Sequence, residues 1–361
     1  MGMLRLALAM AVLLSHLPPA TFHFMSGGVA VQAFFIVSGF YMSLVLSGKY
    51  ADRTLFYSNR ILRLAPTYFV MMALAGIALF GFSITATAWP AIFESAYSNP
   101  VSAVILVLEN VFVVGQEMLY WFKISPEDGT LFLDLEGGLP TEDEPVAWQA
   151  LLVPQSWSLS MELMFYAIAP FLVRCGWKTL AAIAAASIAL RFAGHALPVD
   201  YGLWQGRFFP TALFMFVFGM LAHRAAPLAA RLPKLTGWVV ALATLALVVC
   251  QPMLGLPNEA GRWLIYIAIA CAIPFIFHAF KDNAIDRWIG ELSYPMYLSH
   301  LLIVALVLTF QPPFAAWVAI GATLVVSALF VVIVESPVDR WRQRRAARSG
   351  KPQMQTAPAM P

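Results

Sequence analysis

Two residues near the start of the chain, Arg5 and His16, are eleven positions apart and are separated only by Leu, Ala, Met, Val and one Ser. A helix over this stretch therefore carries a cation at one end and an imidazole at the other. At 1.5 Å of rise per residue the two side chains lie about 16 Å apart, roughly half the thickness of a bilayer's hydrocarbon core. Because an ionisable group at that depth is costly unless it faces water or a partner, His16 is a functional candidate.

A second polar cluster, residues 156–162, opens another apolar stretch with the sequence Ser-Trp-Ser-Leu-Ser-Met-Glu. Ser156 could simply cap a helix, and the helix dipole favours a carboxylate in the first turns. However, Glu162 is followed by Leu-Met-Phe-Tyr, and a buried carboxylate requires a partner. A carboxylate that orients a histidine is a usual general-base arrangement, and His16 is expected at a compatible depth. A pair between Glu162 and His16 is therefore one hypothesis.

Arg60 and Arg63 are three residues apart at the start of an apolar run, so on a helix they share one face. They are either a plain anchor on the cytoplasmic side or a forked cationic clamp for phosphate groups, which suits the geometry of guanidinium. The spacing alone leaves both interpretations open.

The segment Ser293–His300 begins a later apolar run with the sequence Ser-Tyr-Pro-Met-Tyr-Leu-Ser-His. Tyr297 and His300 either line a cavity or belong to the aromatic belt at the membrane interface, and for Tyr294 and Tyr297 the belt is favoured. Glu335 ends the last apolar run beside a basic tail, and we expect it to pair with a nearby arginine. The remaining histidines have no spacing typical of a metal site, so no metal is expected.

These candidates lie in a chain of 361 residues that is 61% hydrophobic and only 11% charged, against about 25% charged residues in soluble domains. Apolar runs of span length recur throughout. The sequence therefore predicts an all-α polytopic membrane protein, with a membrane domain over residues 1–340 and a basic, disordered cytoplasmic tail over residues 341–361. The net charge is only +3, and Lys and Arg are clustered, which indicates orientation in a membrane and not a nucleic-acid surface.

The apolar runs predict about ten transmembrane helices, and clusters of Lys and Arg follow every second run. Both termini are therefore expected in the cytoplasm. The predicted spans are residues 5–16, 29–46, 64–82, 157–173, 179–191, 208–222, 235–249, 263–280, 294–310 and 317–334.

One further apolar run, residues 101–122, contains Glu109, Asn110, Gln116 and Glu117. If it crossed the membrane, the acidic loop at residues 127–144 would be cytoplasmic and every later basic loop would lie outside. We therefore predict a re-entrant or interfacial segment. The N-terminal run also resembles a cleavable signal peptide, but the placement of Arg5 and His16 favours its retention.

Taken in order, the motifs resemble the membrane-bound acyltransferase-3 family over about residues 3 to 340. The motifs are Arg-x10-His (Arg5, His16), Gly-Gly followed by Phe-Phe-Ile-Val-Ser-Gly-Phe (residues 27–40), Arg-x-x-Arg (Arg60, Arg63), Trp-Ser-Leu-Ser-x-Glu-x-x-Phe-Tyr (residues 157–166), Ser-Tyr-x-x-Tyr-Leu-x-His (residues 293–300) and Glu-Ser-Pro (residues 335–337).

The resemblance implies an enzyme of the bacterial inner membrane that transfers acyl groups other than amino-acyl groups. It would move an acyl group, most often acetyl, from acyl-CoA to a hydroxyl of a surface polysaccharide, lipopolysaccharide or glycolipid. Acyl-CoA and the carbohydrate acceptor would be its partners together with membrane lipids, and no metal or nucleic acid would take part. The implied site residues are His16 as the catalytic histidine with Arg5 in support, Glu162 in the active-site wall, Arg60 and Arg63 at the acyl-CoA, and Trp157, Ser158, Tyr297 and His300 around the cavity.

Two positions depart from the family pattern. The family often has Gly-Val-Asp before its Phe-Phe pair, where this chain has Ala30-Val31-Gln32-Ala33, and the frequent second Glu after Glu162 is Leu163. These changes concern the binding of donor or acceptor more than the reaction class.

Two rival functions start from the same residues. A transporter or flippase would use the intramembrane His and Glu to bind protons or a polar solute, and it predicts solute flux without acyl-CoA. A non-enzymatic scaffold would merely pair these groups inside the bundle, and it predicts that conservative changes at His16 are harmless.

Overall fold

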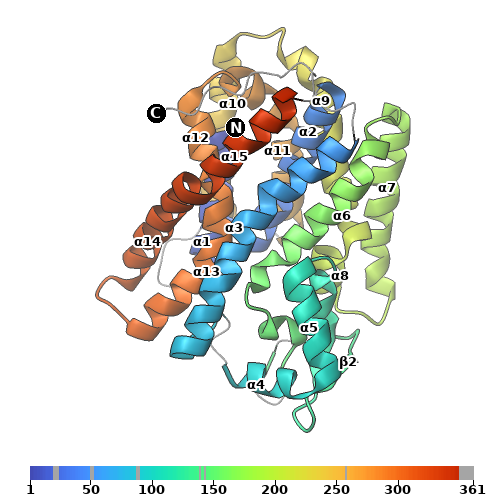
Figure 1. The fold of residues 1–361 in the computed structure, drawn as a ribbon. Coiled ribbons are helices and arrows are strands. Elements are labelled where there is room, and N and C mark those ends of the chain that lie inside the picture. Colours follow the sequence, from blue (N-terminus) through green and yellow to red (C-terminus); the bar gives the residue numbers. More distant parts are fainter. Residues whose placement is uncertain are drawn as a thin grey trace.

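The computed structural model of the chain is a bundle of long helices with one small hairpin (Figure 1). It describes residues 1–18, 24–48, 53–86, 90–137, 140–141, 144–256 and 258–348. The all-α polytopic class is confirmed, since the described strands are two of three residues each. The elements are α1 (Gly2–Leu14), α2 (Gly27–Gly48), α3 (Arg53–Phe82), α4 (Pro90–Ser98), α5 (Pro100–Phe112), η1 (Gln116–Trp121), β1 (Phe122–Ile124), β2 (Leu131–Leu133), η2 (Ala147–Ala150), η3 (Pro154–Ser156), α6 (Trp157–Leu172), α7 (Trp177–Ala193), η4 (Gly194–Ala196), α8 (Tyr201–Arg207), α9 (Phe209–Ala229), α10 (Lys234–Cys250), η5 (Gln251–Leu254), α11 (Asn258–Phe280), α12 (Ala284–Glu291), α13 (Ser293–Phe310), α14 (Ala315–Phe330), the π-helical η6 (Val331–Glu335) and α15 (Ser336–Arg348).

Eight helical segments in the described part of the chain are long and apolar enough to cross a membrane. The other two predicted spans correspond to α1, which has 13 residues, and α6, which has 16. Both are shorter than the approximately 20 residues that a full crossing requires. The protein is therefore a multi-pass membrane protein in which two of the ten predicted spans are short helices.

The basic loops meet at one end of the bundle, where α1 begins and where α12 and α15 lie (Figure 1); we call it the basic end. Arg224, near the end of α9, donates to the carbonyl of Cys175 between α6 and α7 (2.5 Å). Lys234 pairs with Asp282 across the α9–α10 and α11–α12 connections (3.7 Å). These contacts bring connections that are far apart in sequence to a single end.

The segment predicted to be re-entrant lies at the opposite end (Figure 1). It forms α5 and η1, and the helix before it, α4, is bent by 115° relative to α5. The side chain of Asn99 caps α5 by accepting from the amides of Val101 and Ser102, and Tyr68 of α3 donates to the carbonyl of Asn110 (2.6 Å). Helix α3 ends and α6 begins at this same end, so the segment between them starts and finishes on one side of the bundle (Figure 1).

The acidic loop after it contains the hairpin β1–β2, with Phe122 opposite Leu133. Lys123 forms ion pairs with Asp134 and Glu144, both at 2.8 Å. Hydrogen bonds to these two carboxylates raise the pKa of Lys123. The loop is therefore folded over its described residues.

The tail differs in part from its prediction. Residues 341–348 were expected to be disordered, but they continue α15, where Arg345 donates to Ser58 of α3 (3.2 Å). Packing of this helix against α3 explains the order. The rest of the predicted tail, residues 349–361, lies outside the described residues.

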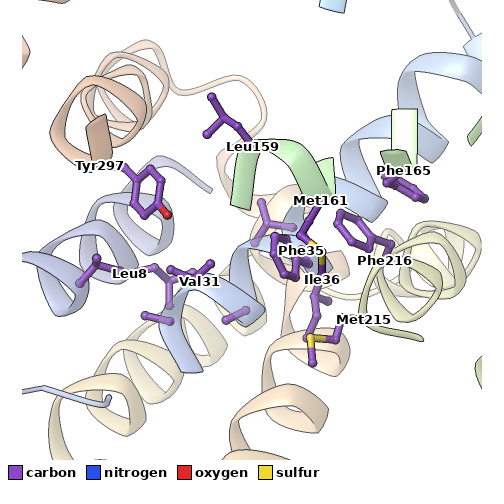
Figure 2. Close-up of a cluster of buried hydrophobic side chains, with 14 of the residues drawn as sticks. Leu8, Val31, Phe35, Ile36, Leu159, Met161, Phe165, Met215, Phe216 and Tyr297 are labelled. Atoms are coloured by element: carbon purple, nitrogen blue, oxygen red, sulfur yellow. The ribbon is translucent and has the colours of Figure 1, made fainter. Parts of the chain in front are cut away.

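The centre of the bundle is the crossing of α2 and α9. At Gly39 a Cβ would lie 1.9 Å from the carbonyl oxygen of Phe216, and at Gly219 it would lie 1.9 Å from that of Ile36. The two backbones therefore touch, as at small-residue interfaces in membranes. Beside the crossing, Phe35 stacks on Phe216 (4.7 Å) and Phe216 stacks on Phe165 of α6 (4.3 Å), as Figure 2 shows.

Gly39→Ala and Gly219→Ala should each force these helices apart. We expect each substitution to lower the free energy of unfolding by about 1–3 kcal/mol, the usual cost of overpacking, because the added methyl group meets backbone. Thermal unfolding of the purified protein in detergent would measure this. Gly321→Ala, in α14, is the matched control, since nothing lies within 4 Å of its Cβ position. Equal stability of the Gly39→Ala variant and the control would contradict the close crossing.

Candidate active site

A cavity of about 830 Å³ opens from the basic end into the bundle. That volume is within the range of small-molecule and cofactor sites. Its lining includes Lys281 and Arg287 at the basic end, and Ser158 and Tyr297, which are buried. Four of the predicted site residues, Arg5, Arg60, Arg63 and Glu162, also line it. The structure therefore gathers residues from α1, α3, α6 and α13 around a single space.

Glu162 is held on the wall of this cavity. Ser38 of α2 donates to its carboxylate (2.7 Å), and the hydroxyl of Tyr166, one helical turn later, donates to the same oxygen. The pairing of Glu162 with His16 that the sequence suggested is wrong. Glu162 lies one turn beyond Ser158 along α6, toward the basic end, where Ser38 and Tyr166 satisfy it.

Arg60 and Arg63 share one face, as their spacing predicts, but they differ in charge balance. Arg63 forms an ion pair with Glu335 of η6 (3.3 Å). This confirms the expectation that Glu335 pairs with an arginine. Arg60 forms no ion pair with any described residue, and its guanidinium lies over the ring of Phe56 (5.9 Å). Arg60 is therefore the uncompensated cation of the pair.

Arg5 lies at the other side of the same cavity, near the start of α1. Its charge interacts with those of Glu162 and Glu335. Arg5 is thus part of the cationic wall, and the length of α1 separates it from His16.

His16 lies in the turn that follows α1, beside His300 of α13. The two ring centroids are 5.0 Å apart. The Nδ1 atom of His16 lies 2.8 Å from the carbonyl oxygen of Val12, and that of His300 lies 2.6 Å from the carbonyl oxygen of Tyr297. Since a carbonyl only accepts, Nδ1 carries the proton in both rings and Nε2 is the free base. His16 is exposed, whereas His300 is buried and its Nε2 has no hydrogen-bond partner in the described part of the chain.

Tyr297 connects the cavity to the histidine pair. Its hydroxyl donates to the carbonyl of Gln155 (2.6 Å) and accepts from Ser158 (2.7 Å), and its ring lies 5.8 Å from that of His300. Tyr297 and Tyr294 both line the cavity. The belt interpretation of these tyrosines is therefore wrong, because helix α13 is packed inside the bundle and its tyrosines do not face lipid headgroups.

Trp157 is the first residue of α6 and immediately precedes Ser158. Its ring meets Phe35 edge to face (6.4 Å) and lies under the guanidinium of Arg207 (4.2 Å). Arg207 also lies over the ring of Tyr120 (3.4 Å). Sequence reasoning missed Arg207. The positive-inside rule could have identified it. By that rule the end opposite to the basic loops is poor in cations, so an arginine at that end is not explained by membrane orientation.

A buried polar network positions α8, which ends at Arg207. Arg191 of α7 donates to the side-chain oxygen of Gln205 (3.0 Å) and to its carbonyl. Tyr266 of α11 donates to Gln32, which itself reaches the carbonyl of Gln205 (3.5 Å). Gln32, one of the departures from the family pattern, is therefore part of this network.

These features define a class of protein: a polytopic membrane protein with a cationic cavity at its basic end and a pair of histidines connected to that cavity through Tyr297. A family model described as an acyltransferase domain matches residues 2–335. The chain belongs to this acyltransferase-3 family, and it is an acyltransferase. It is 23% identical over 337 residues to the exopolysaccharide production protein ExoZ of Rhizobium meliloti (strain 1021). The aligned region covers 90% of this chain and 93% of that protein. No solved structure matches the chain significantly.

The Arg63–Glu335 pair predicts a large effect on stability. Glu335→Leu leaves the guanidinium unpaired in a largely buried position, and we expect the free energy of unfolding to fall by about 3–5 kcal/mol. Thermal unfolding in detergent would measure it. The double variant Arg63→Gln/Glu335→Gln should recover part of the loss because no lone charge remains.

Glu259→Gln is the control for this experiment. It removes a carboxylate from a more exposed ion pair, that with Arg262, in which 44% of the glutamate side chain is accessible. Such pairs contribute about 0–1 kcal/mol. A Glu335→Leu variant as stable as this control would show that the ion pair is not structural.

Proposed function

We propose that the protein is an O-acyltransferase that moves an acyl group, most often acetyl, from acyl-CoA to a hydroxyl of a saccharide. The observation that carries this proposal is the cavity that joins the arginines of α3 to the Tyr297–Ser158 pair. The ring of Tyr297 lies beside that of His300, which in turn neighbours His16. The name of the relative, an exopolysaccharide production protein, supports a surface saccharide as the acceptor.

The donor would enter from the basic end, which the positive-inside rule assigns to the cytoplasm of a bacterial inner membrane. Both termini would lie on that side. The phosphates would bind near Arg60, whose charge no described carboxylate neutralises, and guanidinium is well suited to phosphate oxygens. The thioester would then reach Ser158 and Tyr297, which are buried and line the same cavity.

The acceptor would meet His16 from the opposite end. The Nε2 atom of His16 either takes the proton of the acceptor hydroxyl as this attacks the thioester, or takes the acyl group first and passes it on. In both routes the C–S bond breaks, a C–O bond to the acceptor forms, and the hydroxyl proton ends on the sulfur of CoA. The routes differ in one observable, the acyl-enzyme that forms with donor alone, and intact-protein mass spectrometry detects it.

His16→Ala should abolish acyl transfer without unfolding the protein. We expect turnover to fall by about 10²–10⁴-fold, the usual contribution of a general base, with the Kd for acetyl-CoA unchanged, because His16 lies outside the donor cavity. Release of CoA from radiolabelled acetyl-CoA by the purified protein would measure it. His278→Ala is the matched control, since His278 on α11 does not line the cavity. Wild-type turnover in the His16→Ala variant would refute this mechanism.

Arg60→Gln should weaken binding of the donor. The loss of a charge-assisted contact to phosphate is expected to raise the Kd for acetyl-CoA by about 10- to 100-fold. Arg53→Gln, on the same helix but outside the cavity, should leave Kd unchanged. Equilibrium binding of radiolabelled acetyl-CoA in detergent tests both. If the wild type binds no short acyl-CoA, the donor assignment fails and solute flux in vesicles becomes the next test, as the transporter hypothesis requires.

A further inference from the structure

Arg207 is a cation that the fold buries against aromatic rings and does not neutralise. Its guanidinium carbon lies 3.4 Å from the ring centroid of Tyr120 and 4.2 Å from that of Trp157. Its Nη1 atom is buried, and within the described ranges it has no hydrogen-bond partner and no carboxylate forms an ion pair with the guanidinium. An apolar side chain would fill this space at a lower desolvation cost, so a purely structural role does not explain the charge.

The location of this charge links it to the site. Arg207 interacts electrostatically with His16 and with Tyr297. Its stacking partner Trp157 precedes Ser158, which donates to Tyr297. The cation therefore stacks on the residue next to Ser158, and the proposed function places the thioester at Ser158 and Tyr297.

The fold also fixes the position of Arg207. Helix α8 has only seven residues, but Arg191 holds Gln205, two positions before Arg207, by two hydrogen bonds. On the same helix, Trp204 stacks on Phe208 (4.7 Å). A charge held in advance stabilises a transition state without reorganisation at the moment of reaction.

We propose that Arg207 stabilises the oxyanion of the tetrahedral intermediate. This inference rests on the proposed function. When an oxygen nucleophile or His16 adds to the thioester carbonyl, the C=O π electrons move onto its oxygen, and the Nη1 N–H group of Arg207 donates to that oxyanion. Collapse of the intermediate restores the C=O bond, breaks the C–S bond and releases the thiolate, which takes the proton. Arg207 keeps its own proton throughout.

Hydrolysis of acetyl-CoA by the purified protein, with water as the acceptor, is the test. Arg207→Met should lower the kcat of hydrolysis by about 10²-fold, as removal of an oxyanion donor does, with the Kd for CoA within about twofold of wild type. Arg207→Lys, which keeps a charge but not the planar fork, should recover part of the rate. Arg262→Gln removes an arginine that is paired with Glu259 and serves as the control.

The outcomes separate the alternatives. If Arg207 instead binds a permanent anion on the saccharide, hydrolysis by Arg207→Met stays at the wild-type rate, and the proposal is overturned. If kcat falls only together with CoA binding, the residue acts on the donor or on folding. The Arg207→Gln variant, which is polar and of similar length, then repeats the test. The same joint loss of kcat and CoA binding in that variant also overturns the proposal. If wild-type protein neither binds nor hydrolyses acetyl-CoA, the proposed function itself fails.

Discussion

Charge inside an apolar bundle is the constraint on which this structure depends. With no water in the hydrocarbon region, each ionisable side chain must find a partner or face a cavity. Three solutions appear side by side: an ion pair between Arg63 and Glu335, hydrogen bonds to Glu162 from Ser38 and Tyr166, and aromatic rings around Arg207. Only the first pairs opposite charges, and the third leaves a buried cation beside the residue that precedes Ser158.

The polar groups that were predicted as one site form two layers. The first layer is the cationic cavity at the basic end, with Arg5, Arg60 and Glu162. The second layer is the His16–His300 pair, which lies beyond the far end of α1. Tyr297 and Ser158 lie between them and are joined by a hydrogen bond of 2.7 Å. In the proposed function, this division would let the donor enter from one side and the acceptor from the other, so that neither would have to cross the bilayer.

Hydropathy and basic clusters predicted the ten helices, because those depend on composition along one helix at a time. Of the residues that the family resemblance placed around the cavity, Ser158 and Tyr297 line it, whereas Trp157 and His300 do not. Apart from the pairing of Glu335 with an arginine, the partners across helices were not predictable. Glu162 bonds to Ser38 instead of His16 because the rotation and depth of α6 decide the contact, and the sequence specifies neither. Arg207 was not predicted as a site residue. Its partners, Tyr120 of η1 and Trp157 of α6, lie on two elements that no local sequence pattern brings together.

The two short helices, α1 and α6, place helix ends, with backbone groups that are unpaired inside the helix, beside the site. Helix α1 ends after 13 residues and α6 begins only after two 3₁₀ turns, η2 and η3, so both have free ends within the bundle. The last carbonyls of a helix lack partners inside it. At α1 the carbonyl of Val12 lies 2.7 Å from the hydroxyl of Ser15 and 2.8 Å from Nδ1 of His16. A continuous helix would use that carbonyl for its own ladder, so the early end of α1 is what fixes the tautomer that leaves Nε2 of His16 free.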